Sequence, residues 1–221
     1  MLSPTQLTAV EVRILGSLVE KETTTPDVYP LSLNALVNAC NQTSNRDPVM
    51  ELAEDAVRWA INNLRQQSLV RAVQRSDSRV MKYQHLMTET MSLDAPGLAV
   101  MCVLMLRGPQ TVGEIKGRTG RLNEFASLSD VDETLAALAA RELVVELPRR
   151  PGQKEVRYAH LLSGAVEASV AGEERAAPTS STAPFGPGSD RIAALEATVE
   201  ELRRQLADLQ ERFDAFKGQF G

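Results

Sequence analysis

An internal duplication constrains the fold of this chain more than any other feature. A tyrosine, a histidine and a leucine recur at the same spacing in residues 83–86 and 158–161, so that the two histidines of the sequence, His85 and His160, occupy matching places. The same succession of helical patterns and short apolar runs precedes both copies. Because a repeated sequence builds a repeated supersecondary unit, we expect two similar domains in tandem.

The first copy has three helical patterns followed by two short strands. Residues 7–22 carry apolar side chains at helical spacing, and the positions between them are expected to face solvent: Glu11, Arg13, Glu20 and Lys21. Ser32 is placed to cap a second helix. Asp47 and Pro48 are placed to open a third helix that runs to about Gln67. Residues 69–73 and 80–83 then have the composition of a strand hairpin.

The second copy repeats this order with shorter connections. Residues 98–107 form the first helical pattern, Thr111 and Glu114 have the spacing of a capping box for the second, and Ser129 begins the third. Gly117 and Gly120 are expected to end the second helix. A hairpin follows over residues 143–147 and 155–161. Three helices and a hairpin in this order are typical of a winged helix-turn-helix.

We therefore predict a mainly α fold with small β-hairpin wings (α+β). Tandem winged helix-turn-helix domains are expected over residues 1–92 and 93–172. Residues 173–189 are predicted to be a flexible linker, because Ala, Pro, Ser, Thr and Gly dominate positions 176–189 and cannot build a core.

The last segment, residues 190–221, is predicted to be a coiled-coil helix. Its apolar residues alternate at spacings of three and four, which is the pattern of a coiled-coil seam. The seam residues are Ile192, Leu195, Val199, Leu202, Leu206, Leu209, Phe213 and Phe216. A lone helix with such a stripe would be poorly soluble, so we expect a homodimer. The alternative is that the helix folds back onto the winged domains.

The composition is that of an ordinary globular protein, with 43% hydrophobic and 24% charged residues. No stretch approaches the roughly 20 apolar residues that span a bilayer, and the start lacks a basic segment followed by an apolar one. We therefore expect a cytoplasmic protein without membrane contact. Cys40 and Cys102 lie among apolar helical neighbours and are expected to be buried free thiols.

The sequence shows no motif expected of an enzyme. It has no glycine-rich phosphate loop, no plausible pair of nucleophile and base, and no His or Cys cluster at metal-ligand spacing. His85 and His160 stand alone in sequence and are expected to pack or hydrogen-bond at the strand ends that close each hairpin. We predict a non-enzymatic protein without metal or cofactor.

Basic and polar side chains in residues 58–82 favour double-stranded DNA as a partner. At about 100° per residue, Arg58, Asn62 and Arg65 share one flank of the third helix, and such side chains suit guanine and adenine edges. The candidate DNA contacts are Arg58, Asn62, Arg65, Arg71, Arg75, Arg79 and Lys82. The net charge of -5 argues mildly against a polyanion. Three acids also crowd the start of this helix, where favouring the helix dipole is their alternative role: Glu51, Glu54 and Asp55.

The turn after the second helix is another candidate surface, because it concentrates hydrogen-bonding side chains: Asn38, Asn41, Asn45 and Arg46. Such density either fixes helix ends and turns, or binds phosphates or a partner's backbone. Trp59 leaves a similar choice between burial by the neighbouring repeat and contact with a ligand. The third helix of the second copy offers no base outside its apolar core, where it carries Asp132, Glu133, Ala136, Ala137, Ala139 and Ala140. That alanine face suits close helix packing, between the repeats or across a dimer.

A family resemblance rests on residues 24–42 and 44–50, TTPDVYPLSLNALVNACNQ and SNRDPVM. They closely resemble the signature of the YceH-like bacterial proteins. Residues 106–111 and 157–162 are similar to the second-half motifs of that family, so the match covers residues 4–162. The resemblance implies a tandem winged-helix fold and a bacterial cytosolic origin, and it supplies no catalytic or ligand residues.

Two functions from different classes follow. In the first, a dimer presents paired winged domains to DNA as a transcriptional regulator. In the second, the winged domains dock proteins and the coiled coil selects the partner, as in an assembly factor that binds no DNA.

Overall fold

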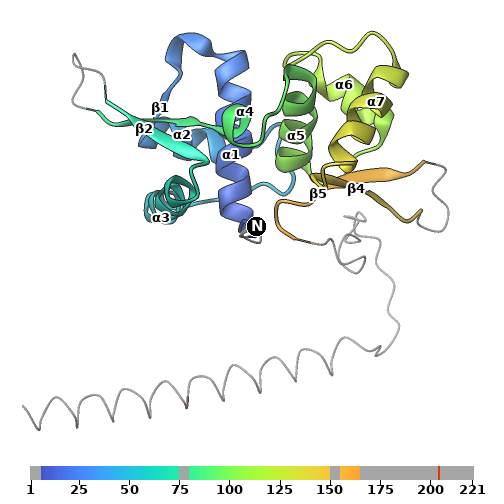
Figure 1. The fold of residues 1–221 in the computed structure, drawn as a ribbon. Coiled ribbons are helices and arrows are strands. Elements are labelled where there is room, and N and C mark those ends of the chain that lie inside the picture. Colours follow the sequence, from blue (N-terminus) through green and yellow to red (C-terminus); the bar gives the residue numbers. More distant parts are fainter. Residues whose placement is uncertain (1–5, 75–79, 150–154, 165–203, 205–221) are drawn as a thin grey trace, which may run out of the picture. The chain divides into compact units, whose positions relative to one another are not determined.

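The computed structural model describes residues 6–74, 80–149, 155–164 and 204. Within residues 1–171 the described parts form one compact unit of helices with two small antiparallel sheets (Figure 1). The expected combination of helices with small antiparallel sheets is therefore confirmed, and about half of the described residues are helical. The predicted linker, the coiled-coil helix and its seam residues from Ile192 to Phe216 lie outside the described residues.

The described residues of the first half, 6–74 and 80–90, contain eight elements. They are α1 (Ala9–Thr24), the 3-10 turn η1 (Pro26–Val28), β1 (Leu31–Ser32), α2 (Leu33–Cys40), α3 (Glu54–Gln66), β2 (Val70–Val73), β3 (Lys82–His85) and α4 (Met87–Thr90). Ser32 caps α2 as predicted, because its hydroxyl accepts a hydrogen bond from the Ala35 backbone N–H at 3.3 Å. The two-residue strand β1 and the one-turn helix α4 are too short to produce a sequence pattern.

The second half, residues 94–164, contains α5 (Ala95–Arg107), α6 (Val112–Thr119), α7 (Leu128–Ala139), β4 (Val144–Leu147) and β5 (Arg157–His160). The predicted capping box of Thr111 and Glu114 is present. The expectation that Gly117 ends this helix is wrong, because α6 continues to Thr119 and has Gly120 as its C-cap. A glycine in a helix costs only about 1 kcal/mol, which the burial of neighbouring Ile115 outweighs.

The duplicated tyrosines hold equivalent places in the two sheets. Tyr83 on β3 pairs with Leu31, and Tyr158 on β5 forms a bridge with Gln110. Each partner directly precedes the N-cap of the second helix of its half, Ser32 or Thr111. The sheets are antiparallel, in the orders β1-β3-β2 and β4-β5. The repeated sequence motif therefore corresponds to the same backbone pairing in both halves.

Helix α1 is buried on all sides, and this overturns one expectation from its sequence. Glu11, Arg13 and Glu20 were expected to face solvent, yet only 3%, 2% and 9% of their surfaces are exposed. The reason is that α1 packs against α2 and α3 on one side and against α5 of the second half on the other (Figure 1). The two halves thus share a core, and Lys21 is partly buried at its edge.

Helix α3 begins at Glu54, so the prediction that Asp47 and Pro48 open it is wrong. The preceding segment is held by side chains from elsewhere in the first half. Asn41 accepts a hydrogen bond from the Leu52 N–H at 2.8 Å and donates one to the Leu52 carbonyl at 2.9 Å. Arg13 donates to the Pro48 carbonyl. Backbone groups bonded in this way are not available to a first helical turn.

The third helices of the two halves, α3 and α7, bury apolar residues at matching positions. At most 3% of each side chain is exposed for Val57, Ile61, Leu64, Val131, Leu135 and Leu138. Cys40 and Cys102 are buried free thiols, as expected. Burial raises the pKa of the Cys40 thiol to about 11, so it stays protonated near neutral pH. Searched over its described part, the chain has no helix with the length and apolarity needed to cross a bilayer.

Candidate functional site

The outer face of α3 is the most distinctive polar surface of the first half. Its inner face is filled by Val57, Ala60, Ile61 and Leu64, which are almost completely buried. The remaining positions point outward at helical spacing, so Arg58, Asn62 and Arg65 are exposed together with Gln66. Trp59 has 62% of its surface exposed, which leaves it uncovered by the second half. Arginine, asparagine and an indole thus share one solvent face.

The two arginines of this face differ in their partners. Arg58 forms ion pairs with Glu54, four residues earlier, and with Asp55, three residues earlier. Its side chain remains 55% exposed. The acids at the start of α3 therefore neutralise part of the charge of Arg58. The guanidinium of Arg65 makes no hydrogen bond or ion pair within the described part of the chain. Arg65 is consequently the cation on α3 that is available to an incoming anion.

The hairpin of β2 and β3 adds two more basic side chains on one face. Arg71 lies opposite Gln84, and Lys82 lies opposite Val73. Because side chains alternate along a strand, these four residues share one face of the sheet, with Arg71 exposed and Lys82 partly exposed. The other face carries the buried Val70 and His85. The candidate residues Arg75 and Arg79 lie outside the described residues.

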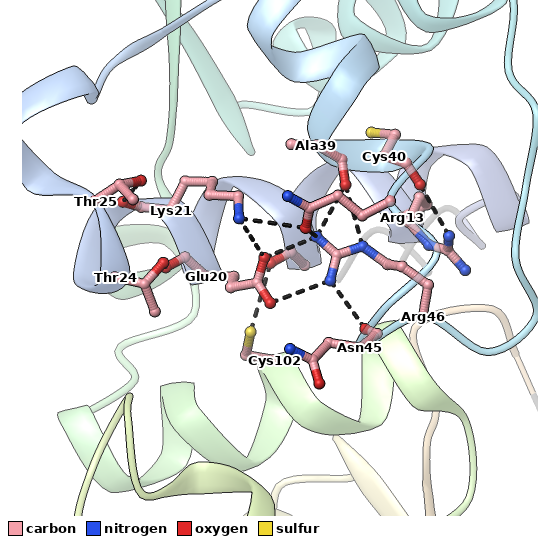
Figure 2. Close-up of polar contacts among 12 residues, drawn as sticks. Arg13, Glu20, Lys21, Thr24, Thr25, Ala39, Cys40, Asn45, Arg46 and Cys102 are labelled. Carbon is pink, nitrogen blue, oxygen red and sulfur yellow. Dashed lines mark hydrogen bonds and ion pairs between the residues drawn. The ribbon is translucent and has the colours of Figure 1, made fainter.

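The polar turn after α2 is built around a buried arginine. Arg46 is only 6% exposed, and its Nη1 and Nη2 atoms donate to the two carboxylate oxygens of Glu20 at 3.1 and 2.7 Å. It also donates to the carbonyls of Ala39 and Asn45 and to the side chain of Gln42 (Figure 2). All of these contacts are internal. The structure therefore places Arg46 in a structural role, fastening the turn to α1.

The charge of Glu20 is maintained by this network. Burial alone would raise the pKa of Glu20, but hydrogen bonds and charge from Arg46 and Lys21 hold that pKa below its usual value. The asparagines of the turn are placed differently. Asn41 forms two hydrogen bonds with the backbone of Leu52, and Asn38 is exposed on α2. Asn45 adopts a positive φ of 57°, which asparagine tolerates, and its side-chain oxygen accepts a hydrogen bond from Arg107.

The two matching histidines have different surroundings. The Nε2 atom of His85 lies 2.8 Å from a carboxylate oxygen of Glu22, and its Nδ1 accepts a hydrogen bond from the Met87 N–H. His160 has a buried Nδ1 without a hydrogen-bond partner among the described residues. Both lie at the ends of the strands that close the hairpins, as expected. No group of three or more potential metal ligands converges within the described ranges.

We expect His160 to make the protein less stable in acid. Burial lowers the pKa of His160 from 6.5 to about 4, so between these values the unfolded chain binds a proton that the folded chain excludes. The free energy of unfolding should therefore begin to fall as the pH drops below about 6.5, and the loss should approach about 3 kcal/mol near pH 4. Urea unfolding of the parent and of His160→Gln at pH 7, 5.5 and 4 measures this difference. Equal losses in both proteins would contradict it.

The outer face of α7 contrasts with that of α3. Asp132, Glu133, Ala136 and Ala139 are all exposed, so neither the first half nor any other described segment covers this face. At matching positions, α3 carries Arg58, Trp59, Asn62 and Arg65. The alanine face of α7 is therefore not packed between the two repeats, contrary to one of the two expectations from the sequence. The duplication has kept the core of the third helix and changed its surface.

Comparison with known proteins shows that this chain is similar to bacterial proteins over nearly the whole length of both chains. A family model described as "Protein of unknown function, DUF480" matches residues 7–153. A UPF0502 protein of Pelobacter propionicus is 50% identical over 219 residues, which are 97% of this chain and 98% of the relative. A UPF0502 protein of Aeromonas hydrophila is 48% identical over 214 residues, 95% and 97% of the two chains. A third UPF0502 protein, of Solibacter usitatus, is 48% identical over 209 residues, which are 95% of this chain and 98% of the relative.

Proposed function

The chain belongs to the DUF480 family, and from its geometry we propose that it binds double-stranded DNA through α3 and the β2–β3 hairpin, as a tandem winged-helix regulator. This membership agrees with the family resemblance of the sequence motifs and gives no activity of its own. The proposal is supported by the order of elements in both halves, three helices and then an antiparallel hairpin. In a winged helix, the third helix enters the major groove and the hairpin lies along the backbone.

The observation that carries the proposal is the solvent face of α3. Arg65 and Asn62 lie one turn apart there, exposed and free of acidic partners, and such side chains read guanine and adenine edges. Trp59 beside them offers a flat apolar surface to sugars or bases. Arg71 and Lys82 on one face of the hairpin supply charges for phosphates. The net charge of -5 argues mildly against a polyanion, but it does not prevent this arrangement, because a local basic patch can bind DNA on an acidic protein.

The first half is the DNA-contacting half in this proposal. On α7, acidic and alanine side chains occupy the places that Arg58, Trp59, Asn62 and Arg65 hold on α3. A single winged unit makes few contacts, so specific binding calls for two copies of the chain at paired half-sites. The coiled-coil pattern of residues 190–221 supports such a homodimer.

Arg65→Ala is expected to weaken DNA binding at least tenfold and to relax the base preference at the contacted position, with little change in the slope of log affinity against log salt, because a contact to a base edge is lost while the phosphate contacts remain. The measurement is selection of genomic fragments on the full-length protein, followed by titration of an enriched fragment at several salt concentrations. Arg121→Ala is the matched control, since it removes the same charge from an exposed site in the second half. Equal affinities of Arg65→Ala and the parent for the enriched fragment would refute the role of α3.

Protein docking is a second candidate, and the exposed alanine face of α7 favours it, because small side chains allow close helix packing. If the selection enriches no genomic fragment over the others, the DNA-binding proposal fails and protein docking remains. In that case Ala136→Arg on α7 should abolish partner capture, while Asn62→Arg on α3 should not. A protein without residues 190–221, run in both assays, separates the contribution of the predicted coiled coil.

A further inference from the structure

A cavity of about 320 Å³ lies where the two halves meet. Its walls come from the end of α1, the turn after α2, helix α5 and the end of α6, which are distant in sequence. This volume is at the lower limit for pockets that bind small organic molecules, so a ligand of few atoms would fill it. The cavity lies away from α3 and the β2–β3 hairpin and plays no part in the proposed DNA contact.

Three arginines line this cavity: Arg107 in the last turn of α5, Arg118 in the last turn of α6, and Arg121 just beyond it. The acid in the wall is Glu20, whose carboxylate is already paired with the buried Arg46 at 2.7 Å and with Lys21 at 3.1 Å. Glu20 is therefore shared with Arg46 and Lys21 and only partly offsets the charge of the three lining arginines. The described residues that line the cavity therefore carry more positive than negative charge, although Arg118 has an ion pair with Glu114.

The individual arginines differ in how far they are engaged. Arg118 lies 3.7 Å from Glu114, a long ion pair, and Glu114 has a closer partner in Arg157 at 2.9 Å. Arg107 donates to the side-chain oxygen of Asn45, which leaves the Asn45 amide nitrogen without a hydrogen bond in the described part of the chain. The guanidinium of Arg121 makes no hydrogen bond or ion pair there either. Among the described residues, hydrogen-bond donors without a partner thus come from both halves of the chain and border the same cavity.

The electrostatic surroundings of Arg107 agree with this account. Burial lowers its pKa, and the charges of Arg118 and Arg46 lower that pKa further, while the charges of Asp47 and Glu20 only partly oppose them. A positive field of this kind is relieved by an anion. Gly117 and Gly120 leave room for one, because a Cβ placed on either would meet no atom within 4 Å.

We propose that this cavity binds a small metabolite carrying oxyanions with at least two negative charges. Guanidinium groups match the geometry of phosphate and carboxylate oxygens, and hydrogen bonds between such charged groups are about twice as strong as neutral ones. The ligand would contact Arg107 and Asn45 on one side and Arg118 and Arg121 on the other. Since these residues belong to both halves, its binding would stabilise the packing of one half against the other.

The test is calorimetric titration of the full-length protein with pyrophosphate, inorganic phosphate and citrate, at constant ionic strength so that general screening is equal. Saturable binding of at least one probe is expected, together with a rise in its melting temperature. Binding of pyrophosphate alone would identify a phosphorylated ligand, and binding of citrate alone a polycarboxylate. Absence of saturable binding for all three probes would overturn the proposal.

Two variant pairs locate the site. Arg121→Gln should weaken binding of the tightest probe at least tenfold, whereas Arg65→Gln, which removes an equally unpaired arginine from α3, should leave it unchanged. Gly117→Glu should abolish binding by placing a carboxylate at the cavity wall, and Gly117→Ala should retain it. Unaltered binding in Arg121→Gln and Gly117→Glu would place the anion elsewhere and refute the proposal. Because Arg65 reports on DNA and Arg121 on the anion, either proposal can fail without the other.

Discussion

Arg46→Ala is expected to lower the free energy of unfolding by about 3–5 kcal/mol, the usual loss when one partner of a buried ion pair is removed. The variant leaves Glu20 charged inside the protein with only Lys21 beside it, and it leaves the Ala39 carbonyl without its donor. Because Arg46 joins the turn after α2 to α1, the loss should also loosen the packing of the first half. Urea or guanidinium unfolding of the full chain measures it.

The matched control for this prediction is Arg58→Ala. It removes the same side chain from the exposed pair with Glu54, where both partners are more than half exposed, so the expected loss is only about 0–0.5 kcal/mol. Similar losses of unfolding free energy in the two variants would show that burial does not increase the contribution of the Arg46–Glu20 pair to stability. Acid should act in the same direction. Since the pKa of Glu20 is lowered in the folded state, its contribution is present above the ordinary glutamate pKa and is lost as the pH falls below it.

Gly16→Leu is expected to lower the free energy of unfolding by about 3 kcal/mol, by forcing α1 away from α5. A Cβ at Gly16 would lie 2.8 Å from Cδ2 and 2.9 Å from Cγ of Leu106, and 3.2 Å from Cβ of Met105. The Leu106 side chain can move, but Met105 Cβ is fixed to the α5 backbone. A leucine at this position needs space that the buried α1–α5 contact does not have.

The matched control is Gly117→Leu in α6, where the added Cβ meets open space. There the substitution should raise the free energy of unfolding by about 0.5–1 kcal/mol, because leucine is the better helix former. Thermal and denaturant unfolding of both variants tests the pair. A Gly16→Leu protein as stable as Gly117→Leu would mean that α1 and α5 do not pack closely.

Local elements of the fold were predictable because their signals lie within a few residues. Ser32 and the Thr111–Glu114 pair mark helix starts by hydrogen bonds to their own chain. The apolar spacing of Val57, Ile61 and Leu64 has meaning in any helix, so both the core face and the exposed face of α3 follow from it. The start of α3 did not follow, because Asn41 holds Leu52 through contacts between distant segments.

The candidate sites divide in the same way. The exposure of Arg58, Asn62 and Arg65 could be derived from helical periodicity alone. The polar turn could not be resolved, since the partner of Arg46 lies in α1 and no sequence spacing connects it with Glu20. The cavity arginines were missed altogether. Arg118 and Arg121 lie together at the end of α6, but Arg107 comes from α5, and no sequence spacing connects it with them.

By itself, the sequence determined the repeated unit, the helix starts at Ser32 and at the Thr111–Glu114 capping box, and the apolar faces, because these depend on neighbours within one turn or one strand pair. It placed the start of α7 at Ser129, whereas Ser127 is the N-cap of that helix. Only the tertiary structure decided that α1 is central, that its charges are buried and that three arginines share a cavity. The physical reason is that a second apolar helix, α5, packs against α1, while the turn after α2 supplies partners for Arg13 and Glu20. Which face of a helix is buried depends on what packs against it, and that partner is set by the folding of the whole unit.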